Sequence, residues 1–545
     1  MLVRNLQKHW VACILNVALV GVLLAGCAPS PATPTAPSAP TVVAPSPVAP
    51  TATSVPTATS VPTPLVPPPP ADLKLTIALS SDINTLDPHK TASVGTDHSV
   101  ISHLYSSLVI RGPDLKLYPN AAESWEVVND TTWRFKLRPG ITYPNGEKLD
   151  ANTVKWNIER VLDPEVKARI KSWFDPISEV KVIDDTTVEI ITKTPYAVLA
   201  DQLSMLWFLA PKWAAEHNPA AEAMGTGPYN LVEWVKDDHV TLEAKTDYWG
   251  EKPLWKTVVF RPVPEASSRI AGLLAGDYDI IKGFPPADLD RINASGRAVA
   301  GSVPSTRSAL IKLNTFKEPI NDVRVRKALN YAVDKDSLIK NLLNNSTVKS
   351  NGQVMTEHYF GYNPDLQPYP YDPEKAKQLL AEAGFAGGLE LEFDVPTGVY
   401  VLGEQIAQAI AEQLRQVGIT AKVTEMPFSV YMDKYLKEKN LAQMAYITYA
   451  WPTIDADGIL GLFESGNQYA YWDNEEFTNA LKEGRSTTDP EKRRAAYKKA
   501  TQIMYDEAIV VFLFPQPAVY AVANHIDWKD RGDDWVRAFD VKLKK

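Results

Sequence analysis

The segment 389-LELEFDVPTGVYVLGEQIAQAIAEQLRQVGITAKV-423 carries a strand, a helix and a second strand in succession. Its first seven residues alternate apolar and acidic side chains, which is the period-2 pattern of a strand. We expect a helix over 402–417, ended by Gly418, and then a strand over 419–423. Another helix and a strand over 444–450 continue the alternation. Strand–helix alternation of this kind predicts an α/β sheet with helices on its faces.

Mixed α/β patterns extend in both directions from this segment. Two alternating strands, a hairpin and an Asp-capped helix precede it, and a long helix opened by Asp489-Pro490 follows it. Two α/β bodies, with a chain tail left over after the second, indicate two lobes. The expected strands and hairpin cover residues 73–79, 133–138, 180–192, 309–313 and 509–514.

The composition of the 545 residues is that of a soluble globular protein. Apolar residues make up 45% and charged residues 22%, which excludes global disorder and a multi-span membrane protein. The formal charge of −9 argues against a nucleic-acid partner, because phosphate binding needs a basic surface. Two cysteines exclude a disulfide scaffold and a cysteine-built zinc site.

The first 26 residues are predicted to be a lipoprotein signal peptide. Arg4 and Lys8 precede an apolar stretch over 11–24, which is too short to span a bilayer comfortably. It ends in Leu24-Ala25-Gly26-Cys27, which resembles the lipobox of bacterial lipoproteins. We expect Cys27 to be acylated and the protein to be extracytoplasmic, lipid-anchored to the outer face of the cytoplasmic membrane, in the periplasm or at the cell surface. The alternative is a chance small-residue cluster after an anchor helix.

Residues 27–71 are predicted to form a disordered stalk. Between Ala28 and Pro70 there is no charged residue, and fifteen of the 43 residues are proline. Such a segment cannot bury enough apolar surface to offset ordering, and its prolines favour extended polyproline II. The folded part is therefore expected to begin at Asp72.

Several short motifs of the folded part occur together in one order. They are Thr85-Leu86-Asp87-Pro88-His89, Ala122-Glu123-Ser124-Trp125, Trp133 to Arg138, Gly225-Thr226-Gly227-Pro228-Tyr229, Asp322 to Leu329 and Tyr371 to Ala376. With them, the chain from about residue 75 to about residue 525 resembles family 5 of the extracytoplasmic solute-binding proteins. These are the oligopeptide- and dipeptide-binding components of ABC importers.

The resemblance implies a two-lobed periplasmic-binding-protein fold, type II-like, with a hinged ligand cleft. Lobe I would comprise residues 72–308, with an inserted subdomain at about 106–220, and lobe II residues 309–515. Residues 516–545 would return to lobe I. It also implies a monomer that captures a peptide or a related small molecule by cleft closure and serves an ABC permease and its ATPase subunits.

The resemblance places the ligand in the cleft. Peptide binders carry Gly-Trp-x-x-Asp there, whereas this chain reads Ala450-Trp451-Pro452-Thr453-Ile454-Asp455. Either Asp455 replaces the missing ammonium partner of a peptide, or Trp451 stacks on an oligosaccharide or another non-peptide ligand. The alternative is that both residues only pack the strand end. The candidate ligand-binding residues are Ser93, Val94, Gly95, Thr96, Thr397, Gly398, Tyr400, Ala450, Trp451 and Asp455.

Catalytic and cofactor motifs are missing from the sequence. It contains no Gly-x-x-x-x-Gly-Lys-[Ser/Thr], no Gly-x-Ser-x-Gly and no His-Glu-x-x-His, and its histidines are scattered. We therefore expect no catalytic residue, no metal, no cofactor and no enzyme activity. A secreted hydrolase would need an acid/base pair, and no motif in the sequence places two such residues together. A cell-surface adhesin or chemosensory lipoprotein remains an alternative.

Overall fold

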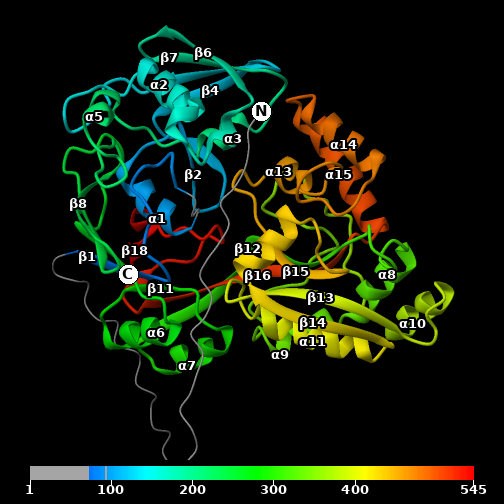
Figure 1. Cartoon of the computed structure of the whole chain (residues 1–545). Helices are drawn as coiled ribbons and strands as arrows, with labels where there is room; N and C mark the ends of the chain where they lie inside the picture. Colours follow the sequence, from blue (N-terminus) through cyan, green and yellow to red (C-terminus); the bar gives the residue numbers. More distant parts are fainter. Residues whose placement is uncertain (1–72, 92–94) are drawn as a thin grey trace, which may run out of the picture. The chain divides into compact units, whose positions relative to one another are not determined.

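The computed structural model describes residues 73–91 and 95–545. The predicted signal peptide, Cys27, the predicted stalk, Ser93 and Val94 lie outside the described residues. Ten strands form one mixed sheet in the order β14-β13-β15-β12-β16-β11-β1-β10-β9-β8. Two long strands at its centre, β12 (Ala298–Leu313) and β16 (Val510–Ala523), pair antiparallel and run from one lobe into the other (Figure 1).

Lobe I holds one end of the large sheet. Strand β1 pairs in parallel with β10 and β11, and β11 pairs antiparallel with β16. Its elements are β1 (Lys74–Leu79), α1 (Thr96–Leu104), β2 (Val109–Arg111), β3 (Leu117–Pro119), β8 (Tyr229–Val235), β9 (His239–Ala244), β10 (Thr257–Pro262), α6 (Ala266–Ala275), β11 (Ile280–Lys282) and α7 (Leu289–Ala294).

An extra subdomain is inserted into lobe I and has its own antiparallel sheet, in the order β4-β5-β7-β6. The Asp150 carboxylate caps its main helix, α2, by accepting a hydrogen bond from the Thr153 backbone N–H at 2.9 Å. The elements are β4 (Ala122–Asn129), β5 (Thr132–Leu137), α2 (Ala151–Leu162), α3 (Lys171–Phe174), β6 (Ile177–Asp184), β7 (Thr187–Thr192), α4 (Leu199–Leu203) and α5 (Pro211–Glu216).

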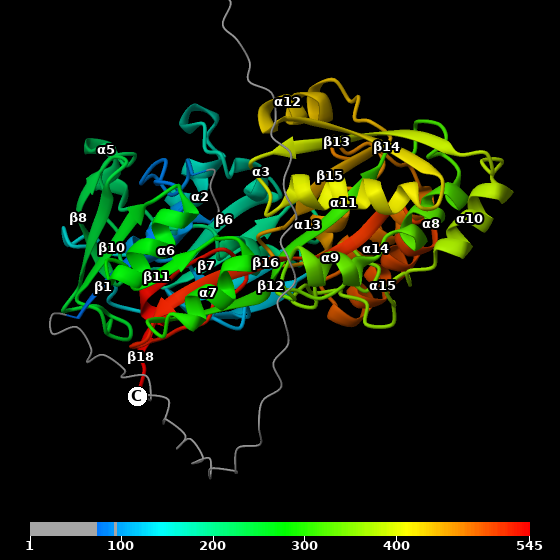
Figure 2. The ribbon, with the colours of Figure 1, turned by 90° about the horizontal axis from the view of Figure 1, so that it is seen from below.

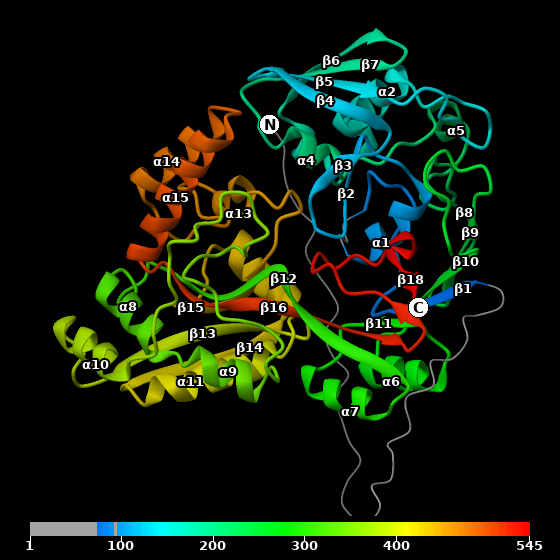
Figure 3. The same ribbon diagram turned by 180° about the vertical axis from the view of Figure 1, so that it is seen from behind.

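Lobe II holds the other end of the large sheet. Strands β13 and β14 are parallel, and α11 covers one face of them (Figure 2). Helices α14 and α15 pack side by side on this lobe (Figure 3). Its elements are α8 (Val323–Ala332), α9 (Lys335–Asn341), α10 (Pro373–Glu382), β13 (Leu389–Thr397), α11 (Gly403–Arg415), β14 (Ile419–Pro427), α12 (Phe428–Met432), β15 (Met444–Tyr449), α13 (Ala456–Gly461), α14 (Glu475–Arg485) and α15 (Pro490–Asp506).

The apolar cores of the two lobes separate along the two shared strands. On β12, residues up to Ala300 pack in lobe I, whereas Ala309 and the apolar residues after it pack in lobe II. The β12–β16 ladder shifts register between Pro304 and Ser308, where Pro304 lies opposite Pro517. The predicted lobe boundaries at 308/309 and 515/516 lie beside this irregularity, and their role as hinges stays a prediction.

The chain tail after β16 packs against lobe I. Strands β17 (Ile526–Asp527) and β18 (Lys542–Leu543) pair with each other. Trp535 and Val536 are buried in the same apolar core as β1 and α1. Within residues 73–91 and 95–545, no helix is both long and apolar enough to cross a membrane.

Candidate ligand-binding site

A cavity of about 310 Å³ lies where segments of both lobes meet. This volume is at the small end of the range for ligand pockets, which is about 300–1,000 Å³. Its walls come from the end of β2, the turn after α4, the irregular part of β12, the segment after β15 and the tail. The lining residues are Gly95, Arg111, Met205, Thr306, Arg307, Ala450, Trp451, Pro452, Ile454, Asp533, Asp534 and Trp535.

A larger cavity, of about 550 Å³, lies within lobe I. The loop over 248–254 and the tail residues Phe539 to Lys542 form much of its wall. We take the smaller cavity as the candidate site, because only a site lined by both lobes couples ligand binding to their closure.

The segment after β15 is fixed to the shared strand β12 by Tyr359. The Trp451 backbone N–H donates to the Tyr359 hydroxyl at 2.8 Å, and that hydroxyl donates to the Thr306 carbonyl at 3.1 Å. Ile454 has a φ of 50°, which is a strained conformation for a β-branched residue. Its carbonyl accepts the Phe360 N–H at 3.0 Å. The cavity wall in lobe II is therefore a preorganised, strained turn.

The Trp451 indole lies directly on a glycine of α13. A Cβ added at Gly458 would stand 2.0 Å from the indole Cδ1 and Nε1 atoms. Trp451 is half-buried and lines both the candidate cavity and a hollow beside α13. Gly458 thus gives the ring its position, with part of the indole left available to a ligand.

Arg111 joins lobe I to this turn. One of its terminal nitrogens, Nη2, donates to Asp201 at 2.7 Å and to the Thr453 carbonyl at 2.6 Å, and Nη1 donates to the Leu115 carbonyl at 2.8 Å. Burial raises the pKa of the Asp201 carboxyl, although the neighbouring guanidinium opposes the rise. The bond to Thr453 is a direct polar contact between the two lobes at the edge of the cavity.

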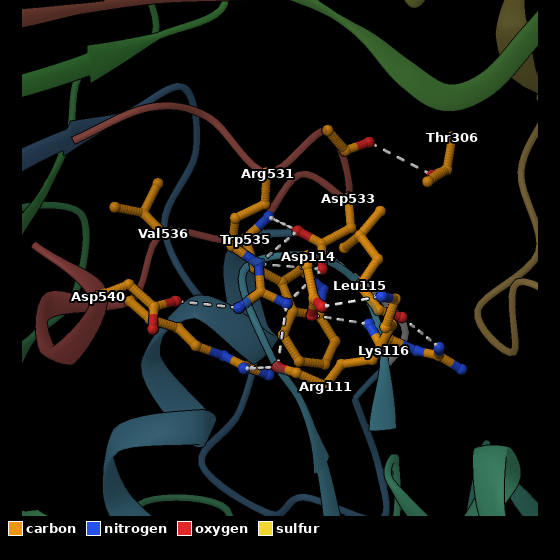
Figure 4. A network of polar contacts seen from close by, with 12 residues as sticks. Arg111, Asp114, Leu115, Lys116, Thr306, Arg531, Asp533, Trp535, Val536 and Asp540 are labelled. Atoms are coloured by element: carbon orange, nitrogen blue, oxygen red, sulfur yellow. Dashed lines mark hydrogen bonds and ion pairs between the residues drawn. The ribbon is translucent and has the colours of Figure 1, made fainter. Parts of the chain in front are cut away.

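The tail presents a loop to the cavity through a buried ion network (Figure 4). The Arg531 guanidinium donates to Asp533 at 2.8 Å and to Asp540 at 2.9 Å. Burial alone would raise the pKa of Asp533, but Arg531, together with Arg537 and Lys282, outweighs burial and holds that pKa below its usual value. The Thr306 N–H donates to the Gly532 carbonyl at 2.9 Å, so the loop is also attached to β12.

Asp534, the next residue of this loop, lies beside Arg307 in the lining of the cavity. Its carboxylate lies 3.7 Å from Arg307 Nη2, and the two side chains are 49% and 33% exposed. Asp534 has a φ of 69°, a left-handed conformation that aspartate tolerates. Gly95 permits this arrangement, because a Cβ there would stand 3.3 Å from the Asp534 Cβ.

Four of the predicted site residues lie at or beside the cavity. Gly95, Ala450 and Trp451 line it. Thr96 lines an adjoining cavity of about 230 Å³, which also includes Gly95, Val401 and Asp534.

Three predicted residues at the end of β13 and just after it are not among the lining residues of the candidate cavity. The Thr397 hydroxyl donates to the Met426 carbonyl at 3.3 Å, and the Gly398 N–H donates to Glu404 at 2.7 Å. The Tyr400 ring packs against Tyr446 with 5.7 Å between centroids. Their role in ligand binding stays a prediction.

Asp455 is buried on the far side of the turn and is also not among the lining residues. Both of its carboxylate oxygens accept from Arg493 Nη2, at 2.9 and 3.0 Å, and it caps α13 by accepting from the Asp457 N–H at 2.9 Å. Burial raises the pKa of Asp455 to about 7, while Arg493 acts in the opposite direction. This geometry gives the carboxylate a partner within the protein and argues against its use as the ammonium partner of a ligand.

Several lining residues were not found by sequence reasoning. Met205 and Thr306 belong to no motif, and Pro452 and Ile454 lie in the quoted segment 450–455 but were not predicted to bind the ligand. The charged lining residues are Arg111, Arg307, Asp533 and Asp534. Tail and hinge residues become neighbours only through the return of the chain to lobe I, so no local spacing could have indicated them. In the part of the chain that the structure describes, no cluster of three or more His, Cys, Asp or Glu residues is arranged to hold a metal ion.

Two α/β lobes that share two long strands and enclose a ligand-sized cavity are the architecture of extracytoplasmic solute-binding proteins. The profile of the bacterial extracellular solute-binding proteins, family 5 Middle, matches residues 116–482. The chain belongs to this family.

Relatives extend over most of the chain. The dipeptide-binding protein of Escherichia coli (strain K12) is 30% identical over 444 residues, which are 74% of this chain and 82% of that protein. The glutathione-binding protein GsiB of Pectobacterium atrosepticum is 27% identical over 462 residues, which are 82% of this chain and 89% of that protein. The solved structure of the ABC transporter substrate-binding protein CtaP from Listeria monocytogenes has a TM-score of 0.78 at 21% identity, and it covers 87% of this chain and 99% of CtaP. At that identity, the likeness shows the fold alone.

Proposed function

We propose that this chain is the membrane-anchored extracytoplasmic solute-binding component of an ABC importer, and that its solute is a short peptide. Membership of family 5 supports the transport role, and relatives named for binding a dipeptide and glutathione support the solute class. The protein acts as a monomer, binds without chemical change, and delivers its solute to a permease energised by ATPase subunits.

The observation that carries the proposal is the cavity shared by the two lobes. Its volume of about 310 Å³ holds roughly ten waters at ~30 Å³ each, which suits a short peptide better than a long one. Charged groups of both signs, Arg307 and Asp534, and the indoles of Trp451 and Trp535 line the same space. A peptide matches this mixture, because it combines terminal charges with apolar side chains.

Capture follows from the way the lobes are connected. A solute that contacts Trp451 in lobe II and the tail loop of lobe I binds both lobes only when they are closed, so binding favours closure. The irregular ladder between Pro304 and Ser308 is the point at which β12 and β16 are least regularly paired. We place the bending there. The bond from Arg111 to the Thr453 carbonyl belongs to the closed arrangement.

An oligosaccharide is the second candidate solute. Two indoles, Trp451 and Trp535, line the cavity, and sugar rings pack well on aromatic faces. The two solute classes differ in charge, so they differ in their dependence on Arg307 and Asp534.

The proposal of a membrane anchor is supported by Cys27 and by the proline-rich residues that follow it in the sequence. Acylation of Cys27 would attach the protein to the outer face of the cytoplasmic membrane, close to the permease. A surface adhesin or chemosensory role without transport is the alternative for an anchored protein of this kind.

Thermal-shift screening of the purified chain against di-, tri- and oligopeptides and oligosaccharides tests the proposal. A ligand at about 100 times its dissociation constant adds roughly 2.7 kcal/mol to the free energy of unfolding. We expect a peptide to raise the melting temperature, Trp451→Ala to reduce the shift, and the exposed-site control Phe316→Ala to leave it unchanged. A shift produced only by oligosaccharides would contradict the peptide assignment, and no shift with any solute would contradict the binding function.

A further inference from the structure

Among the residues that the structure describes, the cavity lining holds one pair of opposite charges that remain accessible to a solute. The Asp534 carboxylate and Arg307 Nη2 are 3.7 Å apart, which is longer than the 2.7–2.9 Å typical of a charge-assisted hydrogen bond. Both side chains retain substantial exposure, at 49% and 33%. Arg307 Nη1 also donates to the Thr448 hydroxyl, at the long distance of 3.5 Å. Each group therefore keeps hydrogen-bonding capacity in the cavity it lines.

The other charged groups near this space already have partners. Arg111 donates to Asp201, Thr453 and Leu115. Asp533 is paired with Arg531, and Asp455 outside the cavity is paired with Arg493. The charge that a solute meets is therefore set mainly by Arg307 and Asp534.

Different elements fix the positions of the two groups. Arg307 lies in the irregular part of β12, and Asp534 lies on the tail loop that Thr306 holds through the Gly532 carbonyl. The left-handed backbone of Asp534 is the kind of uncommon conformation that gathers at binding sites. The short separation of the two charges is thus built into the contact between the tail and β12.

We propose that Arg307 and Asp534 together bind a free α-amino-acid head group, with the ammonium on Asp534 and the carboxylate on Arg307. This inference rests on the proposed peptide-binding function and names the chemistry of the favoured solute. In such a head group the nitrogen and the carboxylate carbon are bonded to one carbon and lie about 2.5 Å apart, which suits two receptor groups separated by 3.7 Å.

The geometry distinguishes two kinds of peptide. In an α-linked peptide the first carboxyl is an amide, so the terminal ammonium and the terminal carboxylate are separated by at least one peptide unit, with ~3.8 Å between successive Cα atoms. In a γ-linked glutamyl peptide the first residue keeps both charges on one carbon. The site should therefore prefer γ-glutamyl peptides, whose remaining atoms would lie against Trp451 and Trp535.

Titration calorimetry on the full chain with two isomers, γ-Glu-Ala-Gly and α-Glu-Ala-Gly, tests this inference. The isomers have the same atoms and the same net charge. We expect the γ isomer to bind about tenfold more tightly or better, since the first residue of the α isomer carries its free carboxylate at the end of the side chain, two carbons further from the ammonium-bearing carbon, where it pairs less well with Arg307. Asp534→Asn and Arg307→Gln should each weaken the γ isomer by about tenfold and remove most of the preference.

The exposed pair Arg261 and Asp238 provides the control. These groups are 2.8 Å apart and 44% and 51% exposed, and they are not among the lining residues of the cavity. Asp238→Asn and Arg261→Gln should leave both affinities unchanged. Asparagine also tolerates the left-handed backbone of residue 534, and unchanged circular dichroism of Asp534→Asn would show that the fold is retained.

The outcomes separate this inference from the proposed function. Equal binding of the two isomers, tighter binding of the α isomer, or unchanged preference in Asp534→Asn would overturn the head-group assignment and leave peptide binding intact. If neither isomer binds at millimolar concentration while other peptides do, the head-group assignment is overturned and the proposed peptide binding is not. Failure of every peptide in the thermal-shift panel would overturn both.

Discussion

Lys312 is a buried amine in lobe II, on β12 and opposite Ala445 of β15, the strand that leads to Trp451. Its Nζ lies 4.3 Å from the Phe463 ring centroid and 5.5 Å from that of Tyr449, and within the described residues it has no hydrogen-bond partner. Burial lowers the pKa of Lys312 to about 7, and the positive charge of Lys439 adds to the effect. Replacing Lys312 by methionine, which has a similar length and no charge, should therefore stabilise the protein.

The magnitude follows from the pKa. Lowering the Lys312 pKa from 10.5 to about 7 corresponds to roughly 5 kcal/mol at ~1.4 kcal/mol per unit. Attraction of the ammonium to the surrounding aromatic rings offsets about 1–2 kcal/mol of this cost. We therefore expect Lys312→Met to raise the free energy of unfolding by about 3 kcal/mol at pH 7.

The pH dependence has a defined sign. Below the folded pKa of Lys312 both states hold the proton, so the cost of the buried charge is constant. Between the folded pKa and 10.5 the unfolded state binds more protons than the folded state, so the stability of the parent protein rises with pH. The advantage of Lys312→Met should consequently shrink by about 2 kcal/mol between pH 7 and pH 9.

Urea unfolding followed by tryptophan fluorescence measures this difference. The exposed-site control is Lys422→Met, whose side chain is 73% exposed and which should change the free energy of unfolding by less than about 0.5 kcal/mol. A destabilised Lys312→Met protein, or an advantage that does not decrease between pH 7 and pH 9, would refute the reasoning.

Three further predictions concern the site and the anchor. Gly458→Ala should weaken peptide binding about tenfold by calorimetry, because its Cβ would displace the Trp451 indole, and unchanged affinity would contradict the placement of that ring. Asp455→Asn should leave affinity within about threefold, since the Asp455 carboxylate is held by Arg493, and a larger loss would restore Asp455 as a ligand partner. Cys27→Ser should abolish incorporation of radiolabelled palmitate, and labelling that persists would remove the lipoprotein assignment.

The regular elements of lobe II could be predicted closely from the sequence. The helix expected over 402–417 is α11 (Gly403–Arg415), and the strand expected over 444–450 is β15 (Met444–Tyr449). Apolar periodicity and the terminal Gly418 are local signals that tertiary packing did not override.

The length of the two shared strands could not be predicted. Pro304, Pro515 and Pro517 lie inside these strands, whereas proline in a sequence normally indicates the end of a strand, so only residues 309–313 and 509–514 were expected to be strands. In the structure these prolines lie at the irregular part of the ladder, where regular pairing is already interrupted. The prolines that prevent the full strands from being predicted thus lie at the proposed bend.

The candidate site could be predicted only in part, because most of its residues are far apart in the sequence. The end of β15 was found through the family resemblance, which led to Trp451. Arg307 and Asp534 come from a shared strand and from the tail, and only the folded topology brings them together. The pairing of Asp455 with Arg493 of α15 was equally invisible in the sequence.

Hydrogen–deuterium exchange with and without the peptide that gives the largest thermal shift tests the central claim most directly. If that peptide binds in the cavity between the lobes, residues 305–307, 450–454 and 533–535 should all gain protection together, because both lobes contact it. Protection confined to one lobe, or centred on residues 248–254 beside the larger cavity of lobe I, would contradict the account.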